Sequence, residues 1–358
     1  MDRLETSKNR IKFFIIIILL PFVFASCSNE KAQDKLVVIN GMTMGTTYTV
    51  KLVKGFKSAV AGEKVDYYLL KKGITQVLKQ INQQMSIFIN DSEISQFNRF
   101  RGSDWFRTSL DTARVIKQAL SVSEKSNGAF DITVGPLVNL WGFGTRTVEG
   151  IPDEDEIKQS LNIIGYKNIS VRLSPPAVKK RIREIYCDLS AIAKGFGVDR
   201  LAEYLDSEKI SSYLIEIGGE VRARGKNNYN KWWRIGIASP TNTFGIQKVI
   251  DLKNRSMATS GDYRNYFEKD GIRYSHTINP KTGRPISHNL ASVTVIDDSC
   301  LVADALATAI SVLGPDKGYD FALKEDLAVF FVQKADNGFI EKSTPKFEKI
   351  LDSRGDQN

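Results

Sequence analysis

The chain has 358 residues, of which 42% are hydrophobic and 25% are charged, and its formal net charge is +9. This is the balance of a globular protein with one large domain or two moderate ones. The basic charge suits an anionic ligand or a membrane surface, but no basic stripe is interleaved with aromatic residues, so we expect no nucleic-acid partner. After residue 27 the only cysteines are Cys187 and Cys300, which excludes a disulfide scaffold and a four-ligand zinc site.

The N-terminus carries the pattern of a targeting segment. Basic residues precede an apolar run over 13–24, which ends just before Cys27. A positive head followed by a short apolar core is typical of a secretory signal, and the run is shorter than the about 20 residues of a membrane span. An anchor helix is the alternative. Because Cys27 follows Ala-Ser, as in bacterial lipoproteins, we expect a signal peptide over 1–27, a lipid anchor on Cys27 and a tether over 28–35.

The first half of the globular part is predicted to be mostly helical. Alternating apolar residues indicate strands, and apolar residues at helical spacing indicate helices. The predicted strands are 36–40, 46–54 and 171–173, with a solvated strand or hairpin at 179–183. The predicted helices are 63–85, a short one capped by Asp91 or Ser92, 109–125 and 152–161.

Glycine and aromatic residues are dense over 129–144. Such density suits a close approach of the backbone and a flat ring to pack on. The alternative is a tight corner of the core.

The stretch 188–197, Asp-Leu-Ser-Ala-Ile-Ala-Lys-Gly-Phe-Gly, lies between a predicted strand over 184–187 and a predicted helix over 198–205. Free backbone N–H groups and the positive end of a helix dipole gather at such a turn. Small side chains let an anion approach, and Lys194 adds a positive charge, so the stretch suits a phosphate or pyrophosphate. Small residues placed there for packing alone are the alternative, and the chain has no Walker loop.

The second half is predicted to contain more strands and one Ala-rich helix. The predicted strands are 184–187, 213–217, 221–225, 233–237, 249–252, 291–296 and, as the last strand, 327–333, followed by a polar tail. The predicted helix covers 301–313.

Asp304 and Thr308 are four residues apart on this predicted helix, so they share one face. Both offer oxygen ligands, which Mg²⁺ prefers, although a pair that only caps or packs the helix is the alternative. His276, one of two histidines, lies in a polar, turn-rich segment over 274–285, where a structural role is the alternative to a catalytic one.

Taken in order, several of these stretches resemble one family, the FAD:protein FMN transferases, also called the ApbE family. The resemblance runs from Met44 to the helix of Asp304, which is most of the chain after the leader. The matching stretches are 44–48 (MGTTY), 91–98 (DSEISQFN), 130–137 (FDITVGPL), 188–195 (DLSAIAKG), 217–219 (IGG), 260–263 (SGDY), 276–285 (HTINPKTGRP) and 304–308 (DALAT).

The resemblance implies an α+β fold of mixed, mainly antiparallel sheets with flanking helices, two lobes and FAD in the cleft between them. It implies one catalytic domain over 36–350, with a tail over 351–358. The implied reaction splits FAD at its pyrophosphate, passes FMN to a Thr or Ser hydroxyl of an acceptor flavoprotein and releases AMP. With a lipid anchor on Cys27, the protein would be held at a membrane of the bacterial cell envelope, facing the periplasm.

The resemblance also implies roles for individual residues. The magnesium ligands would be the side chains of Asp304 and Thr308 and the backbone carbonyl of Ala191. The contacts to FAD would come from Met44, Phe88, Ala129, Phe130 and Asp131 along the cleft, from Asp188 and Lys194 at the adenosine and phosphates, and from His276, Thr277 and Ile278 at the phosphate. The catalytic residues would be Asp304 and His276, with His276 as the base for the acceptor hydroxyl.

Two residues depart from the family pattern. Phe88 replaces a common Tyr, which keeps a ring but loses a hydroxyl, and Asn279 replaces the usual Asp before Pro280, which removes a charge but can still cap the turn. Neither change removes a metal ligand. Two other functions remain open from the sequence: a periplasmic FAD pyrophosphatase that gives FMN and AMP, and a non-enzymatic flavin-binding lipoprotein.

Overall fold

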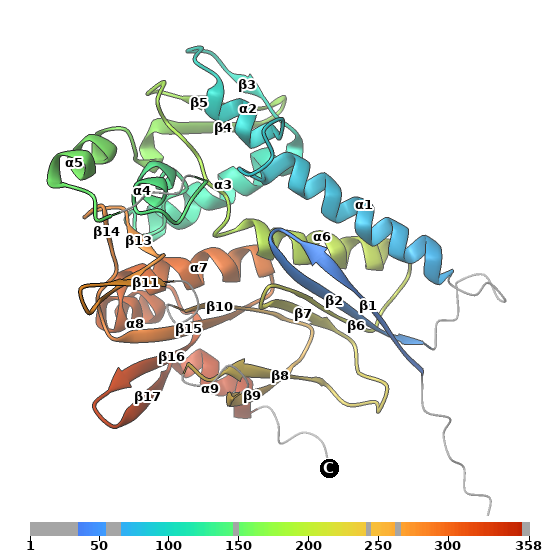
Figure 1. The fold of residues 1–358 in the computed structure, drawn as a ribbon. Coiled ribbons are helices and arrows are strands. Elements are labelled where there is room, and N and C mark those ends of the chain that lie inside the picture. Colours follow the sequence, from blue (N-terminus) through green and yellow to red (C-terminus); the bar gives the residue numbers. More distant parts are fainter. Residues whose placement is uncertain (1–34, 55–65, 146–149, 241–244, 262–265, 353–358) are drawn as a thin grey trace, which may run out of the picture. The chain divides into compact units, whose positions relative to one another are not determined.

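An antiparallel eight-stranded sheet is the framework of residues 34–358, which form a single unit in the computed structural model (Figure 1). The structure describes residues 35–54, 66–145, 150–240, 245–261 and 266–352. The predicted signal peptide, Cys27, the tether up to residue 34 and positions 262 and 263 of the SGDY stretch lie outside these ranges. None of the helices within them is long and apolar enough to cross a membrane.

The strands of the sheet follow one another in space as β1-β2-β6-β7-β10-β15-β16-β17. Their bounds are β1 Lys35–Thr43, β2 Thr46–Lys54, β6 Tyr213–Ile217, β7 Glu220–Arg224, β10 Ser256–Gly261, β15 Leu290–Asp297, β16 Ala328–Ala335 and β17 Gly338–Ser343. Every strand pairing in the described ranges is antiparallel, which confirms the predicted fold class. Met44 and Gly45, both with positive φ, form the two-residue β1–β2 turn.

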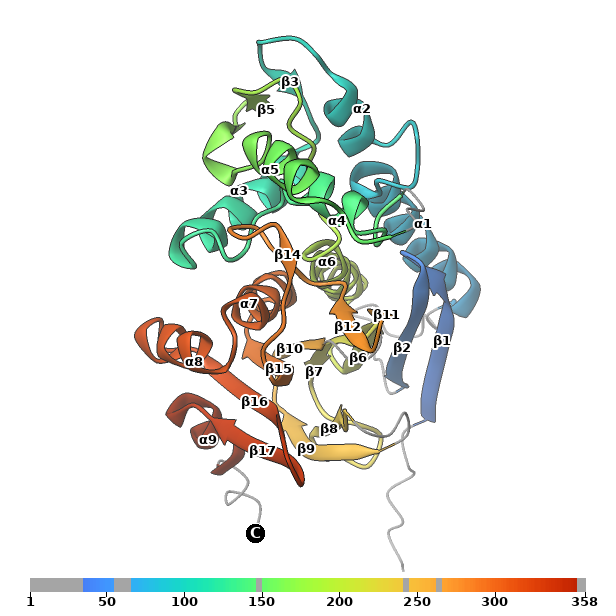
Figure 2. The same cartoon turned by 60° about the vertical axis from the view of Figure 1, so that its left-hand side comes forward.

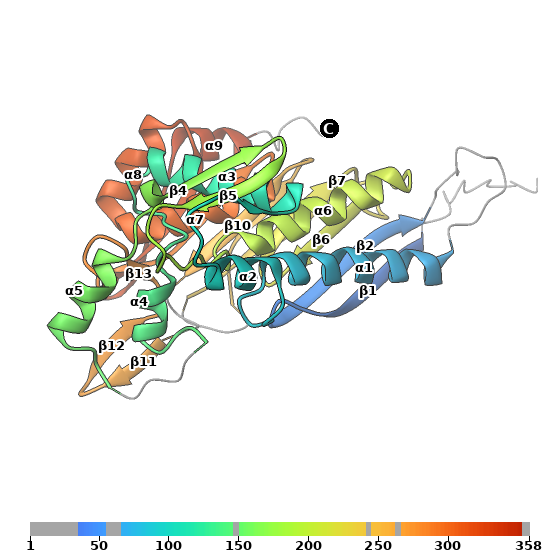
Figure 3. The same ribbon diagram turned by 90° about the horizontal axis from the view of Figure 1, so that it is seen from above.

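Helices cover one face of the sheet, and a small ribbon covers the other (Figure 2). The first face carries α1 Tyr67–Met85, α6 Ala193–Ser207, α7 Cys300–Leu313 and α8 Pro315–Lys324, and Figure 3 shows α1 and α6 along the β1–β2 hairpin. The second face carries β8 Trp233–Ala238, β9 Ile246–Leu252 and α9 Pro345–Asp352. Along β16 successive residues alternate between these two cores, as the two-residue period of a strand requires.

The eight-stranded sheet and the elements that cover it form one lobe. A second lobe, next to α7, consists of helices and a three-stranded sheet (Figure 1). It contains α2 Glu93–Arg99, α3 Leu110–Lys125, α4 Gly135–Leu140, α5 Glu154–Asn162 and a 3-10 turn at Tyr166–Asn168, with β3 Phe106–Arg107, β4 Ile169–Leu173 and β5 Pro176–Lys180. Two short ribbons, β11 Tyr266–Lys269 with β12 Ile272–Ser275 and β13 Ile278–Asn279 with β14 Arg284–Pro285, complete the fold. Ser92 caps α2, as one of the two predicted caps.

The prediction of a strand over 184–187 is wrong. The backbone of Cys187 pairs with a side chain instead of a strand, because the amide of Asn98 both accepts from its N–H and donates to its carbonyl, each at 2.8 Å. The buried Lys180 ammonium donates to three more carbonyls here, including that of Ile185 at 3.2 Å. The helix after this segment begins at Ala193, five residues before the predicted start at Val198.

The prediction that 327–333 is the last strand is also wrong, because β17 and α9 follow β16. β17 was missed because its side chains are mostly exposed and polar, so it shows no apolar alternation. α9 is short, but Phe347 is fully buried and stacks on Phe330 with ring centroids 5.4 Å apart. One buried aromatic residue is too weak a sequence signal for a helix of eight residues.

Candidate active site

A cavity of about 1140 Å³ opens where the large sheet splits. β7 pairs with β10 only through Ser256 and Met257, so the second half of β10 is bonded to β15 alone. Thr259 and Ser260 of that half line the cavity together with the β6–β7 turn and the segment over 129–144, which contains α4. The volume exceeds the range of about 300–1,000 Å³ that is usual for drug-sized ligands, so it suits a large ligand.

The structure brings the predicted site residues together, with one exception. The residues that line the cavity are Phe88, Ala129, Phe130, Asp131, Asp188, Ala191, Lys194, His276, Thr277, Ile278, Asp304 and Thr308. Met44 is not among them. It packs against the hydrophobic core, and its Cε lies 3.1 Å from where a Cβ on Gly197 would sit.

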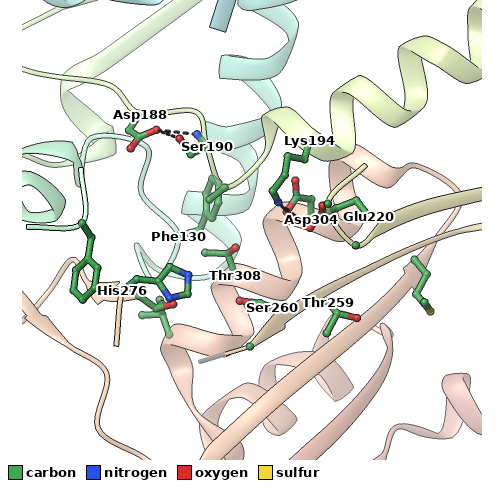
Figure 4. Close-up of a pocket in the computed structure, with 18 of the residues that line it drawn as sticks. Phe130, Asp188, Ser190, Lys194, Glu220, Thr259, Ser260, His276, Asp304 and Thr308 are labelled. Carbon is green, nitrogen blue, oxygen red and sulfur yellow. Dashed lines mark hydrogen bonds and ion pairs between the residues drawn. The ribbon is translucent and has the colours of Figure 1, made fainter. Parts of the chain in front are cut away.

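Lys194, in the first turn of α6, is held between two buried carboxylates (Figure 4). Its Nζ donates to Glu220 Oε1 at 2.8 Å and lies 3.9 Å from Asp304 Oδ1. Burial alone would lower the pKa of Lys194, but the charges of Asp304 and Glu220 raise that pKa above its ordinary value. Lys194 therefore stays protonated and offers a fixed positive charge to a ligand in the cavity.

Glu220 is a site residue that the sequence reasoning missed. It follows the Gly218-Gly219 turn at the start of β7, and its side chain is only 4% exposed. Burial, partly offset by Lys194, raises the pKa of Glu220 to about 7. Its Oε2 is buried and bonded to no described group, so this oxygen can still accept a hydrogen bond. Its place directly after the matched IGG stretch was the one available signal.

Asp304 and Thr308 lie on one face of α7, as predicted, and both line the cavity. Asp304 Oδ2 accepts the backbone N–H of Gly195 at 2.9 Å, whereas Oδ1 forms the longer ion pair with Lys194. A carboxylate has about four lone-pair positions, so capacity for a cation remains. The described residues contain no group of three or more His, Cys, Asp or Glu side chains that could hold a metal ion.

This donor set fits Mg²⁺, which binds proteins through one or two carboxylates and takes its other ligands from water or phosphate. It does not fit zinc, which needs nitrogen or sulfur donors. Ala191, the third predicted ligand, lies in the turn just before α6 and also lines the cavity.

Asp188 lies apart from Lys194, at the other end of the predicted phosphate turn (Figure 4). It accepts hydrogen bonds from Ser190 N at 2.9 Å and Ser190 Oγ at 2.6 Å, and burial raises its pKa. Asp131 is similarly occupied, because its oxygens accept from Thr133 N and Oγ1 and from Tyr166 N, at 2.7–2.8 Å. Both carboxylates therefore hold the shape of the loops that line the cavity.

His276 lies on the same side of the pocket as Thr308 and Ser260 (Figure 4). Its ring meets Phe143 edge-on, with centroids 6.4 Å apart. The segment after it is fixed to the helical lobe, because Ile278 packs with Trp141 and the Trp141 indole donates to the Gly283 carbonyl at 2.8 Å. A polar histidine is thus held at the cavity wall by an apolar anchor.

Comparisons with known proteins identify the family of this chain. The family described as the ApbE family matches residues 44–331. The chain is 41% identical to a FAD:protein FMN transferase of Vibrio cholerae, over 92% of this chain and 96% of that protein, and 40% identical to one of Haemophilus influenzae, over 95% and 98%.

Solved structures give the same result. The flavin transferase ApbE from Vibrio cholerae has a TM-score of 0.81 at 40% identity, covering 88% of this chain and 99% of that one. The flavinyl transferase ApbE of Pseudomonas stutzeri, in its apo form, has a TM-score of 0.80 at 37% identity, covering 89% and 98%. The chain belongs to the ApbE family.

Proposed function

We propose that this protein is a FAD:protein FMN transferase. It cleaves the pyrophosphate of FAD, joins FMN through a phosphoester bond to a Thr or Ser hydroxyl of an acceptor flavoprotein, and releases AMP. The observation that carries this proposal is the meeting of Lys194, Asp304 and Thr308 in one large cavity. A fixed cation beside a pair of oxygen ligands is what transfer of a phosphoryl group needs.

In the proposed reaction, the basic residue binds phosphate and the oxygen ligands bind the cation. The Lys194 ammonium holds a phosphate of FAD, and Glu220 keeps that ammonium in place through its 2.8 Å hydrogen bond. Asp304, Thr308 and the Ala191 carbonyl would hold Mg²⁺. When bound, this ion would offset the negative charge that gathers on the transferred phosphoryl group.

His276 is the proposed base. As the acceptor hydroxyl oxygen forms its bond to the FMN phosphorus, the hydroxyl proton passes to the His276 ring. The bond between that phosphorus and the bridging oxygen breaks, and its electron pair leaves with AMP. Phe88, whose side chain is 69% exposed at the rim, and Phe130, which is buried, place aromatic rings beside the flavin end of the ligand.

We also propose that residues 1–27 direct export, that Cys27 is lipidated and that the catalytic domain over 36–350 faces the periplasm from a membrane, with 28–35 as its tether. The leader pattern supports this proposal. Bacteria that express the full chain and grow with radiolabelled palmitate should yield a labelled protein. Cys27→Ser should abolish the label and release the protein from the membrane fraction. Equal labelling of the variant would contradict the assignment.

The experiment that tests the reaction measures AMP. The purified protein is incubated with FAD and Mg²⁺, with and without an acceptor domain, and an acceptor in which Val replaces the target Thr serves as the control. AMP that appears only with the intact acceptor supports the transferase. AMP released at the same rate without an acceptor would favour a pyrophosphatase, and FAD that stays intact under all conditions would favour a flavin-binding protein.

A further inference from the structure

The carboxylate of Asp199, on α6, is bonded to the first turn of a different helix, α7. Its Oδ2 accepts from Ser299 Oγ at 2.7 Å and from Leu301 N at 3.0 Å, and its Oδ1 accepts from Cys300 N at 3.1 Å. These backbone N–H groups lie at the positive end of the α7 dipole, where a carboxylate is favourable. Asp199 therefore serves as a cap that α7 receives from its neighbour.

This cap is not needed to begin α7. Ser299 already occupies the N-cap position, and its Oγ accepts from Val302 N at 3.3 Å. A cap that comes from the same helix stabilises that helix but does not fix its position relative to neighbouring helices. A carboxylate from α6 instead fixes where α7 lies relative to α6.

The sheet holds the same carboxylate from a third side. Arg222, on β7, donates to Asp199 Oδ1 at 2.8 Å and to the Asp298 carbonyl, just before α7, at 2.6 Å. Asp199 therefore stands at a junction of α6, α7 and the sheet.

The two helices are also bonded at a second place, one turn away. We call each of these two hydrogen-bonded contacts between α6 and α7 a tie. Gly195 precedes Asp199 by four residues on α6, and Asp304 follows Cys300 by four on α7, so the two ties are about 6 Å apart along each helix. At the second tie Gly195 N donates to Asp304 Oδ2 at 2.9 Å. Two ties on antiparallel helices resist both sliding and rotation, whereas one tie would leave a pivot.

We propose that Asp199 is a positioning residue, which holds α7 in register with α6 and so places Asp304 and Thr308 opposite the turn of Ala191 and Lys194 for a divalent cation. The inference rests on the cation site of the proposed function. It assigns no contact between Asp199 and the ligand, because the three oxygen-to-donor bonds to α7 and the Arg222 bond occupy its carboxylate.

The test is Asp199→Asn, with Asp206→Asn as the matched control. Asp206 is the same residue type on the same helix, but it bonds to Tyr213 Oη at 3.0 Å and pairs with Arg224, and so ties α6 to the sheet and not to α7. The readouts are the dissociation constant of Mn²⁺ in the presence of ADP, followed by the paramagnetic signal of free Mn²⁺, and the melting temperature of each purified protein.

Asp199→Asn should weaken Mn²⁺ binding about 10- to 100-fold, as outer-shell changes at metal sites do. Asp206→Asn should lower the melting temperature and change the Mn²⁺ dissociation constant by less than about twofold. Should Asp199→Asn fail to fold, Ser299→Ala, which removes the 2.7 Å bond to Asp199 and the 3.3 Å N-cap bond from Val302 N, should show a smaller loss of the same kind.

Equal Mn²⁺ affinity in Asp199→Asn and wild type, with only the stability reduced, would show that Asp199 is a cap and nothing more. Equal losses of affinity in the Asp199 and Asp206 variants would also overturn the proposal, because any loosening of α6 would then suffice. A wild-type protein that binds no Mn²⁺ would refute the cation site itself, which is a different result from a loss confined to the variant.

Discussion

Gly195→Ala should damage the site through a single methyl group. A Cβ at this position would lie 2.3 Å from the Cys300 carbonyl oxygen, 2.7 Å from the Cys300 carbonyl carbon and 2.8 Å from Asp304 Cβ. Since ordinary contacts are near 3.5 Å, about 1 Å of movement is needed. The obstructing atoms are mainly backbone, so α7 itself must move away from α6.

The energetic terms have opposite signs. Overpacking costs about 1–3 kcal/mol, and the lost Gly195 N–H bond to the Asp304 carboxylate costs about 1.5–3 kcal/mol. Alanine in place of glycine inside a helix raises the free energy of unfolding by about 1 kcal/mol. The expected net loss of stability is about 1.5–5 kcal/mol. A displacement of about 1 Å in the catalytic groups should also lower the transfer rate about 100-fold.

Gly197→Ala is the matched control in the same helix. Its added Cβ would meet Met44 Cε at 3.1 Å and Ile217 Cδ1 at 3.2 Å, both ends of side chains that can shift. We expect a change in stability within about 1 kcal/mol and a transfer rate near that of wild type. Urea denaturation and the rate of acceptor modification measure the two effects. A Gly195→Ala protein with wild-type rate and stability would refute the close approach of α6 and α7.

Three further predictions concern charges in the cavity. Asp304→Asn should lower the transfer rate more than about 100-fold, since a metal contact loses its charge, and added Mg²⁺ should not restore it; full activity at high Mg²⁺ would contradict the ligand role. His276→Ala should lower the transfer rate while FAD affinity, measured by calorimetry, changes little; an equal loss of both would indicate a binding role. Because burial raises the pKa of Glu220 to about 7, the folded protein retains a proton that the unfolded chain loses near pH 4.5. The stability of the metal-free protein should therefore fall as the pH rises from about 4.5 to about 7, and Glu220→Gln should reduce this slope in thermal unfolding; an unchanged slope would contradict the assignment.

Much of the fold could be predicted because its signals are periodic. α1 buries one continuous face, α7 is apolar and buried on nearly all sides, and β2, β6 and β15 are apolar enough to be predicted directly. The segment over 184–187 was predicted as a strand because it mixes β-branched and aromatic residues. Its hydrogen bonds come from the side chain of Asn98, a contact across 89 residues that no local pattern encodes.

The site residues also differ in whether the sequence could predict them. Asp304, Thr308 and Lys194 could be predicted because their spacing or their turn suggests a ligand. Glu220 could not, because a single glutamate at the start of a strand is ordinary, and only its burial against Lys194 makes it part of the site. Asp199 was missed as well, because its partners come from a helix that begins 101 residues later.

The most direct test of the central claim is the mass of the acceptor. An acceptor flavoprotein domain with its target Thr is incubated with this protein, FAD and Mg²⁺, and its intact mass and modified peptide are measured. We predict a gain of one FMN on that Thr, linked through phosphate, with wild type and none with Asp304→Asn. An acceptor of unchanged mass, while FAD binds in the cavity, would contradict the proposed transfer.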